Sequence, residues 1–203
     1  MAELSGKSKQ VLVKRAFDFL LSFFGILISF WIILLAWVLA SINTHSNGFF
    51  IQSRVGQDGK LFKVIKIKTM RPTKQPGTTV TKRGDPRITR LGAFFRRTKI
   101  DELPQLWNVL IGQMSFVGPR PDVPGFADKL TGNEREVLKL RPGITGPATL
   151  KYRNEEELLA AQSDPEKYNR EVIFPDKVRI NLDYMRNWSL RKDISYIWQT
   201  VFK

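Results

Sequence analysis

The 203-residue chain is long enough for one domain with a hydrophobic core and an appendage. It has no cysteine, which excludes disulfides, thiolate catalysis and thiolate zinc sites, and its one histidine, His45, stands in a polar loop. Carboxylates, hydroxyls or lysines must therefore carry any acid, base or nucleophilic chemistry. The formal net charge of +14 implies an anionic partner, namely nucleic acid, an acidic membrane surface or phosphorylated substrates.

The N-terminal 42 residues divide into a basic arm and an apolar segment. Residues 1–15 form a polar, basic arm that we expect to be mobile. In residues 16–42 the only charge is Asp18, and the stretch from Phe19 to Ala40 is long and apolar enough to cross a bilayer as one helix. Because this run is too long for a cleavable signal peptide, we predict a membrane helix.

The charge pattern bears on the topology of that helix. The basic arm favours the cytoplasmic side, so a straight spanning helix would place the following domain, residues 43–203, outside the cell. A domain that uses a nucleotide substrate would find none outside the cell. We therefore predict a re-entrant helix that enters and leaves by the same face, with Gly25 and Ser29 as the positions where it bends.

A β-hairpin is predicted next, with strands at 49–55 and 61–69 and an Asp-Gly turn at 58–59. The second strand carries Lys66 and Lys68 between apolar residues. These lysines fit two interpretations, a solvated strand face or a phosphate-binding face.

Two segments separate this hairpin from the central motif. Residues 70–84 are rich in Pro, Gly, Thr and Lys, and we interpret them as a loop that serves as a lid. Residues 87–97 have the pattern of a basic helix. They place guanidinium groups, including that of Arg96, directly before two carboxylates, which indicates either simple charge pairing or a phosphoryl site.

The two carboxylates, Asp101 and Glu102, open the stretch around which the chain is organised. The apolar residues that follow have helical spacing, and Gly112 ends the pattern about three turns later. We predict that Asp101 is the N-cap and that Thr98 contributes to a capping box. The acids are open to two interpretations, a helix cap alone or a catalytic pair.

The rest of the chain is predicted to be mainly helical. Residues 141–147, which begin with Arg141, are too rich in Pro and Gly for regular structure. The last helix has an apolar stripe with a Trp, flanked by Lys and Arg, and fits either a membrane interface or a core-packed helix. We expect helices at 126–130, 134–140, 155–172 with a break at 163–165, 175–186 and 189–203. The predicted class is α+β: a small, mostly helical domain with a short hairpin, anchored by a re-entrant helix and interfacial amphipathic helices.

Residue chemistry alone favours a phosphoryl transferase at a membrane surface. Arginines and lysines around carboxylates suit a diphosphate with a hard divalent cation, and a carboxylate can attack phosphorus to form an acyl phosphate. The alternative is a non-enzymatic, membrane-anchored basic protein that binds anionic lipid or nucleic acid. It explains the net charge but not the Asp-Glu pair beside Arg-Pro sequences.

Five motifs resemble one known family, the bacterial sugar transferases, also called monotopic phosphoglycosyl transferases. The resemblance covers nearly the whole chain, in order and at matching spacing. The motifs are Lys-Arg-Ala-Phe-Asp at 14–18, Lys-Ile-Lys-Thr-Met at 66–70, Asp-Glu-Leu-Pro-Gln-Leu-Trp-Asn-Val-Leu at 101–110, Met-Ser-Phe-Val-Gly-Pro-Arg-Pro at 114–121 and Arg-Pro-Gly-Ile-Thr-Gly at 141–146.

The resemblance implies a reaction and a location. A sugar 1-phosphate would pass from a UDP-sugar to undecaprenyl phosphate with release of UMP, as the first membrane step in assembling an O-antigen, capsule, exopolysaccharide or glycoprotein glycan. The enzyme would lie in the bacterial inner membrane, with residues 43–203 as its catalytic domain facing the cytoplasm. Its partners would be these substrates and membrane lipids, without nucleic acid, and a homodimer is compatible with the resemblance.

The resemblance also implies roles for particular residues. The family nucleophile, which forms a covalent phosphosugar intermediate, falls on Asp101, and the carboxylate that helps hold Mg²⁺ falls on Glu102. Residues implied to bind substrate or phosphate are Lys66, Lys68, Arg96, Arg120 and Arg141.

Three departures from the family pattern limit the interpretation. Relatives commonly break the membrane helix at a Ser-Pro pair, whereas Ser29 is followed here by Phe30. The sequence after Gly146 also differs from the common Trp-Ala-Gln, which leaves the sugar unassigned. A late aspartate of the family aligns with Asn181, and the sequence leaves open whether the neighbouring Asp183 substitutes for it.

Overall fold

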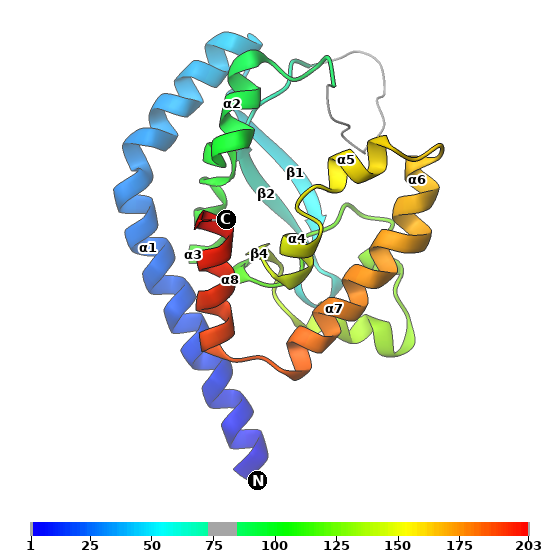
Figure 1. Ribbon diagram of the computed structural model, residues 1–203. Helices are drawn as coiled ribbons and strands as arrows, with labels where there is room; N and C mark the ends of the chain where they lie inside the picture. Colours follow the sequence, from blue (N-terminus) through cyan, green and yellow to red (C-terminus); the bar gives the residue numbers. More distant parts are fainter. Residues whose placement is uncertain (1, 73–84, 203) are drawn as a thin grey trace.

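The computed structural model describes residues 2–72 and 85–202, without the side chains of residues 2–9. One long helix, α1 (Ala2–Thr44), bows around one side of a smaller domain (Figure 1). The arm that we expected to be mobile is therefore the first part of α1. Its division from the membrane helix at residue 16 stays a prediction.

By length and composition, the part of α1 from Gln10 to Thr44 could cross a membrane. The helix is continuous at the predicted bend, where the Ser29 hydroxyl donates a hydrogen bond of 2.6 Å to the Gly25 carbonyl. A bond of this kind to the preceding turn is known to bend helices without breaking them. The re-entrant placement thus stays a prediction. It would require α1 to curve, since the helix is unbroken at Gly25 and Ser29.

The charged motif at 14–18 fastens α1 to the domain. Lys14 bonds to Asp193, and the Asp18 carboxylate accepts a hydrogen bond of 3.0 Å from the Phe116 backbone. The Arg15 guanidinium donates to the carbonyls of Val109 and Leu110 at the end of α3 (Gln105–Leu110), where the helix dipole favours a cation.

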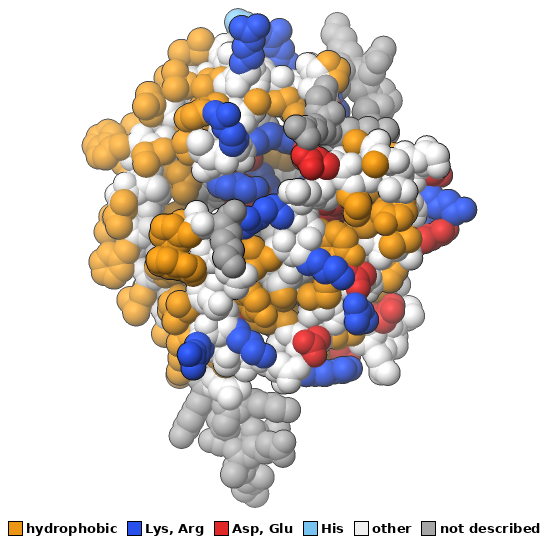
Figure 2. Space-filling view, viewed as in Figure 1, with side chains coloured by type: hydrophobic (Ala, Val, Ile, Leu, Met, Phe, Trp, Pro, Cys, Tyr) orange, Lys and Arg blue, Asp and Glu red, His pale blue; other side chains and the backbone are white. Residues whose placement is uncertain are grey.

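Farther along, α1 packs on the domain through small residues. Ala36 and Ala40 are buried against Ile67 and Phe95. The opposite face of α1 is apolar and exposed, which Figure 2 shows as an apolar edge of the molecule. It includes Leu27, Ile28, Trp31, Leu35 and Ile42.

The predicted hairpin is confirmed. Strands β1 (Phe49–Val55) and β2 (Leu61–Ile67) pair antiparallel, from Phe49 opposite Ile67 to Val55 opposite Leu61. Asp58 and Gly59 have φ angles of 57° and 79°, in the left-handed region that an Asp-Gly pair tolerates well.

A second, unpredicted pair of strands is parallel, joining β3 (Ser115–Val117) to β4 (Gly143–Thr145). The expectation that 141–147 is irregular throughout was wrong, because Gly143 lets two backbones approach. A Cβ there would lie 2.2 Å from the Gly118 nitrogen.

The prediction that a helix starts at Asp101 was wrong, since the following helix, α3, begins at Gln105. Helix α2 (Arg90–Thr98) is followed by its C-cap Lys99, whose φ is 59°, and Asp101 lies in a 3₁₀ turn, η2 (Ile100–Glu102). The Ile100 carbonyl accepts from the Leu103 backbone at 3.2 Å, because Pro104 has no N–H to offer it. Thr98 bonds back to α2 instead of joining a capping box. The predicted end is close, since α3 stops at Leu110 and Gly112 has a φ of 84°.

The remaining described helices cover the hairpin and β4. The patches expected at 126–130 and 134–140 are helical, but as 3₁₀ turns. The elements are η3 (Ala127–Lys129), η4 (Gly132–Lys139), α4 (Pro147–Lys151), α5 (Glu155–Ala160), α6 (Pro165–Tyr168), the π-helical η5 (Asn169–Ile173), α7 (Phe174–Arg186) and α8 (Leu190–Phe202). The mostly helical class with a short hairpin is confirmed, whereas most of the predicted lid, 73–84, lies outside the described residues.

The apolar stripe of α8 decides between its two interpretations. Ile194, Trp198 and Val201 are 52%, 62% and 66% exposed and Ile197 is half-buried, so most of the predicted stripe does not pack on the core. Placement in a membrane interface stays a prediction, now as the remaining alternative.

Candidate active site

The Asp-Glu pair occupies the short turn η2, between the basic helix α2 and α3. Asp101 is only 8% exposed, and its buried Oδ1 accepts no hydrogen bond from the described part of the chain. Burial, and then the negative charge of Glu102, raise the pKa of Asp101 to about 6. The carboxylate therefore has an oxygen without a partner in a site that partly excludes water.

Glu102 has the opposite environment. Its Oε1 accepts hydrogen bonds from Lys66 Nζ on β2 at 2.8 Å and from Arg120 Nη2 at 3.1 Å. Burial disfavours its charge, but the positive charges of Arg120 and Lys66 outweigh that effect and hold its pKa well below the usual range. The two adjacent acids thus differ in their surroundings, because Glu102 is ionised and paired with two cations whereas Asp101 is unpaired.

A third predicted cation, Arg96, also belongs to this site. Its Nε donates to the Thr69 hydroxyl at 3.2 Å, and its charge acts on Asp101. In Figure 2, Lys and Arg side chains gather in a hollow of this face between α2 and α5. The structure therefore brings together Asp101, Glu102, Lys66, Arg96 and Arg120, all of them predicted from the sequence.

Two predicted site residues are not joined to the pair. Lys68 donates to the Ser46 hydroxyl at 2.9 Å, just beyond the end of α1. Arg141 lies near Arg15 of α1, and its buried Nε has no hydrogen-bond partner among the described atoms. No hydrogen bond or ion pair among the described residues connects either side chain to Glu102.

Sequence reasoning missed Lys99 and Asp122. Lys99 precedes the pair directly, and its charge lowers the pKa of both carboxylates. The closeness of Lys99 to the two acids is visible in the sequence, but its left-handed backbone conformation is not. Asp122 lies beyond Arg120, and burial raises its pKa to about 6 despite the charges of Lys177 and Arg54.

The open question about Asp183 has a structural answer. Asp183 is exposed and accepts a hydrogen bond from Asn187 on the same helix. Asn181 is buried, with its Oδ1 unpartnered among the described residues. Asp183 therefore does not occupy the buried position that Asn181 holds.

The donor set fits a cation that the substrate helps to hold. The described residues contain no group of three or more His, Cys, Asp or Glu able to bind a metal. Mg²⁺ in phosphoryl-transfer sites typically takes only one or two carboxylates, with substrate phosphates and waters completing its shell. Glu102, which stays ionised, can supply one such carboxylate.

The charge balance specifies the chemistry that the site can perform. Four cations, Lys66, Arg96, Lys99 and Arg120, act on the two carboxylates, so the site retains positive charge for an anionic substrate. Fixed cations stabilise charge that develops on transferring phosphoryl groups. An unpaired carboxylate beside them can serve as a nucleophile.

The pH dependence of the reaction provides a test. If ionised Asp101 is required, kcat/KM should fall about tenfold per unit below about pH 6. Glu102→Gln should move this acid limb to lower pH, since it removes a negative charge that raises the pKa of Asp101. A steady-state profile from pH 4.5 to 8 measures both, and a flat profile between pH 5 and 7 would contradict the prediction.

Comparison with known proteins identifies the class of the chain. The family model described as "Bacterial sugar transferase" matches residues 9–203. The chain therefore belongs to the bacterial sugar transferase family, and the predicted phosphoglycosyl transferase class is confirmed. The non-enzymatic alternative is set aside.

Individual relatives are similar at 35–40% identity. A Bacillus subtilis protein, named as a candidate undecaprenyl-phosphate N-acetylgalactosaminyl 1-phosphate transferase, is 40% identical over 73% of this chain and 83% of its own length. The "Exopolysaccharide production protein PSS" of Rhizobium leguminosarum is 35% identical over 94% of each chain. The Escherichia coli UDP-glucose:undecaprenyl-phosphate glucose-1-phosphate transferase is 35% identical over 98% of this chain, which spans 41% of that relative.

Proposed function

We propose that the protein transfers a sugar 1-phosphate from a UDP-sugar to undecaprenyl phosphate and releases UMP. The observation that carries the proposal is the unpartnered Asp101 carboxylate, held beside a charge-paired Glu102 and surrounded by Lys66, Arg96 and Arg120. The substrates come from likeness to relatives whose names contain undecaprenyl phosphate, two of which also name UDP-glucose.

The reaction would proceed in two displacements at phosphorus. Asp101 attacks the sugar-bearing phosphorus of the UDP-sugar, an Asp–O–P bond forms, and the P–O bond to UMP breaks with its electron pair leaving on UMP. A phosphate oxygen of undecaprenyl phosphate then attacks the same phosphorus, and the Asp101 carboxylate leaves. The product is a diphosphate-linked lipid sugar that can begin a glycan.

The surrounding groups have supporting roles in this scheme. Lys66, Arg96 and Arg120 would bind the substrate phosphates and stabilise charge on the transferring group. Glu102, with the substrate diphosphate, would hold Mg²⁺, which when bound neutralises the diphosphate and the departing UMP. The low pKa of Glu102 keeps it ionised for that purpose.

The membrane placement is part of the same proposal. The domain packs on α1 from Lys14 to Ala40, so it lies beside the apolar helix along most of the length of that helix. A helix crossing a bilayer along its length would carry the charged domain surface into lipid. A re-entrant α1, lying with its apolar face in the inner membrane and the domain on the cytoplasmic side, avoids that cost. The exposed stripe of α8 would rest on the same surface.

Nucleotide release is the measurement that tests this function. Purified protein with Mg²⁺, undecaprenyl phosphate and each of several UDP-sugars should release UMP with at least one of them. The panel should include glucose, galactose and N-acetylgalactosamine derivatives, because relatives are named for all three sugars. Absence of UMP with every sugar, from protein that remains folded, would contradict the proposal.

A further inference from the structure

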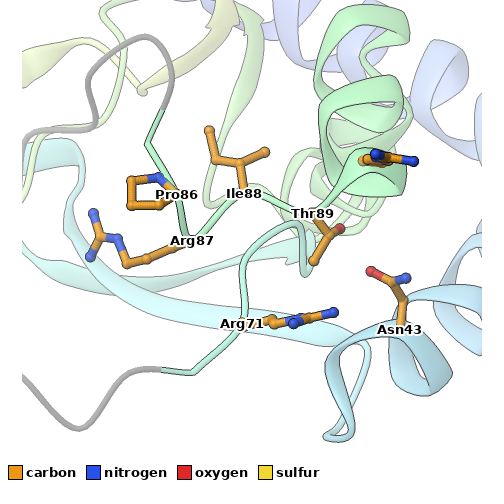
Figure 3. A pocket seen from close by; sticks show the side chains of 7 residues that line it. Asn43, Arg71, Pro86, Arg87, Ile88 and Thr89 are labelled. Atoms are coloured by element: carbon orange, nitrogen blue, oxygen red, sulfur yellow. The ribbon is translucent and has the colours of Figure 1, made fainter.

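A basic pocket lies where α1 ends and α2 begins, and no part of the proposed reaction uses it. It has a volume of about 350 Å³ (Figure 3). In Figure 3, the side chains of Asn43 and Arg71 point toward each other, with Thr89 beside them. Its lining residues are Asn43, Arg71, Pro86, Arg87, Ile88, Thr89 and Arg90.

The pocket has an excess of about two positive charges. Arg87 is neutralised by Asp85, to which its Nη2 donates at 2.6 Å. The side chains of Arg71 and Arg90 make no hydrogen bond or ion pair within the described ranges, 2–72 and 85–202, although the Arg71 backbone N–H donates to the Arg87 carbonyl at 3.0 Å. Two free guanidinium groups at one pocket match a phosphate monoester, whose charge near pH 7 is between about −1.5 and −2.

Two further features favour an anion in the same place. The N-terminus of α2 lies at the pocket, since Thr89 is its N-cap and Arg90 its first residue, and helix N-termini attract phosphate. The Oδ1 atom of Asn43 is buried without a partner among the described atoms. Because the two ends of an asparagine amide are assigned by their contacts, a ligand phosphate would favour the orientation that offers it the N–H₂ group.

We propose that this pocket binds a phosphate group carrying about two negative charges, and that a membrane lipid supplies it. Ile42, 67% exposed on the apolar face of α1, directly precedes Asn43. The pocket thus adjoins the point where an apolar, exposed helix surface meets a polar one. An amphiphile fits such a boundary, with its chains along α1 and its phosphate among the arginines. Soluble phosphate shares the same chemistry and is the other source to test.

The test is protection of individual arginines from phenylglyoxal, followed by peptide mass spectrometry. Full-length protein in a non-ionic, phosphate-free detergent is treated alone, with dihexanoyl phosphatidic acid, with dihexanoyl phosphatidylcholine or with inorganic phosphate. Saturating phosphatidic acid should slow modification of Arg71 and Arg90 at least about fivefold, as expected for an occupied site. The phosphatidylcholine should give no protection, and Arg170 and Arg186, exposed on η5 and α7, serve as internal controls.

Each outcome decides the proposal. Stronger protection by phosphatidic acid than by inorganic phosphate supports a lipid phosphate, and equal protection supports a phosphate pocket but contradicts the lipid source. No protection by either anion overturns the proposal. In the variant Arg71→Gln/Arg90→Gln, protection of Arg87 should disappear, whereas it should persist in Arg170→Gln/Arg186→Gln. The measurement needs no turnover, so its failure is distinguishable from failure of the proposed transferase reaction.

Discussion

Asp101→Asn is expected to lower UMP release by at least about 10³-fold, the scale of loss when a covalent nucleophile is removed. The amide is nearly the same size as the carboxylate but is a very poor nucleophile toward phosphorus. Since Asp101 is buried and its Oδ1 accepts no hydrogen bond among the described residues, the change should cost little stability. The release assay, combined with a thermal melt in the same detergent, measures both effects.

The matched control for this prediction is Asp183→Asn. Asp183 is also an aspartate of the domain, but it is exposed and bonds only to Asn187 among the described residues. Its variant should retain activity within about twofold, as is usual for a surface change. Turnover by Asp101→Asn close to that of the wild type would show that another group attacks phosphorus.

Glu102→Gln is expected to lower UMP release by roughly 10²-fold to 10³-fold, the range found when one preorganised electrostatic group is removed. The substitution keeps the shape of the side chain but removes the charge that holds Lys66 at 2.8 Å and Arg120 at 3.1 Å. The two cations lose their shared partner, and the proposed Mg²⁺ site loses a carboxylate. The loss should be larger at low Mg²⁺ concentration.

Glu156→Gln is the control for Glu102→Gln. Glu156 also faces a site cation, Arg96, at 3.4 Å, but it is 51% exposed. An exposed ion pair contributes little, so activity should change by less than about threefold. Equal activity of Glu102→Gln and wild type across Mg²⁺ concentrations would refute the role of Glu102.

The parts of the fold that follow from local sequence were predictable. The hairpin rests on alternating apolar residues around an Asp-Gly turn, and α7 and α8 on apolar spacing. The parallel pairing of β3 with β4 was not, because it depends on two glycines, Gly118 and Gly143, brought together over 25 residues of chain. Contacts of that kind have no local pattern.

The active site shows the same division. Asp101 and Glu102 were predictable because they are adjacent and because their motif is specific to a family. Their local structure was not, since one missing N–H at Pro104 converts the expected first helical turn into 3₁₀ structure. The error did not affect the predicted pair itself, whose side chains still meet the predicted cations.

Lys68 illustrates the limit of strand periodicity. The family resemblance implied a binding role for both Lys66 and Lys68, and alternate residues of a strand share one face. Only Lys66 lies level with Glu102, whereas Lys68 lies just past the end of β2 and bonds to Ser46. Periodicity gives the face of a strand but not the position of a partner along it.

The most direct test of the proposed mechanism is to trap the covalent intermediate. Wild-type protein is incubated with Mg²⁺ and the active UDP-sugar, without undecaprenyl phosphate, and then denatured for intact and peptide mass spectrometry. We predict one sugar phosphate added to the peptide that contains Asp101, with about one UMP released per protein, and no adduct in Asp101→Asn. An adduct on another residue, or release of UMP only when the lipid acceptor is present, would contradict the mechanism.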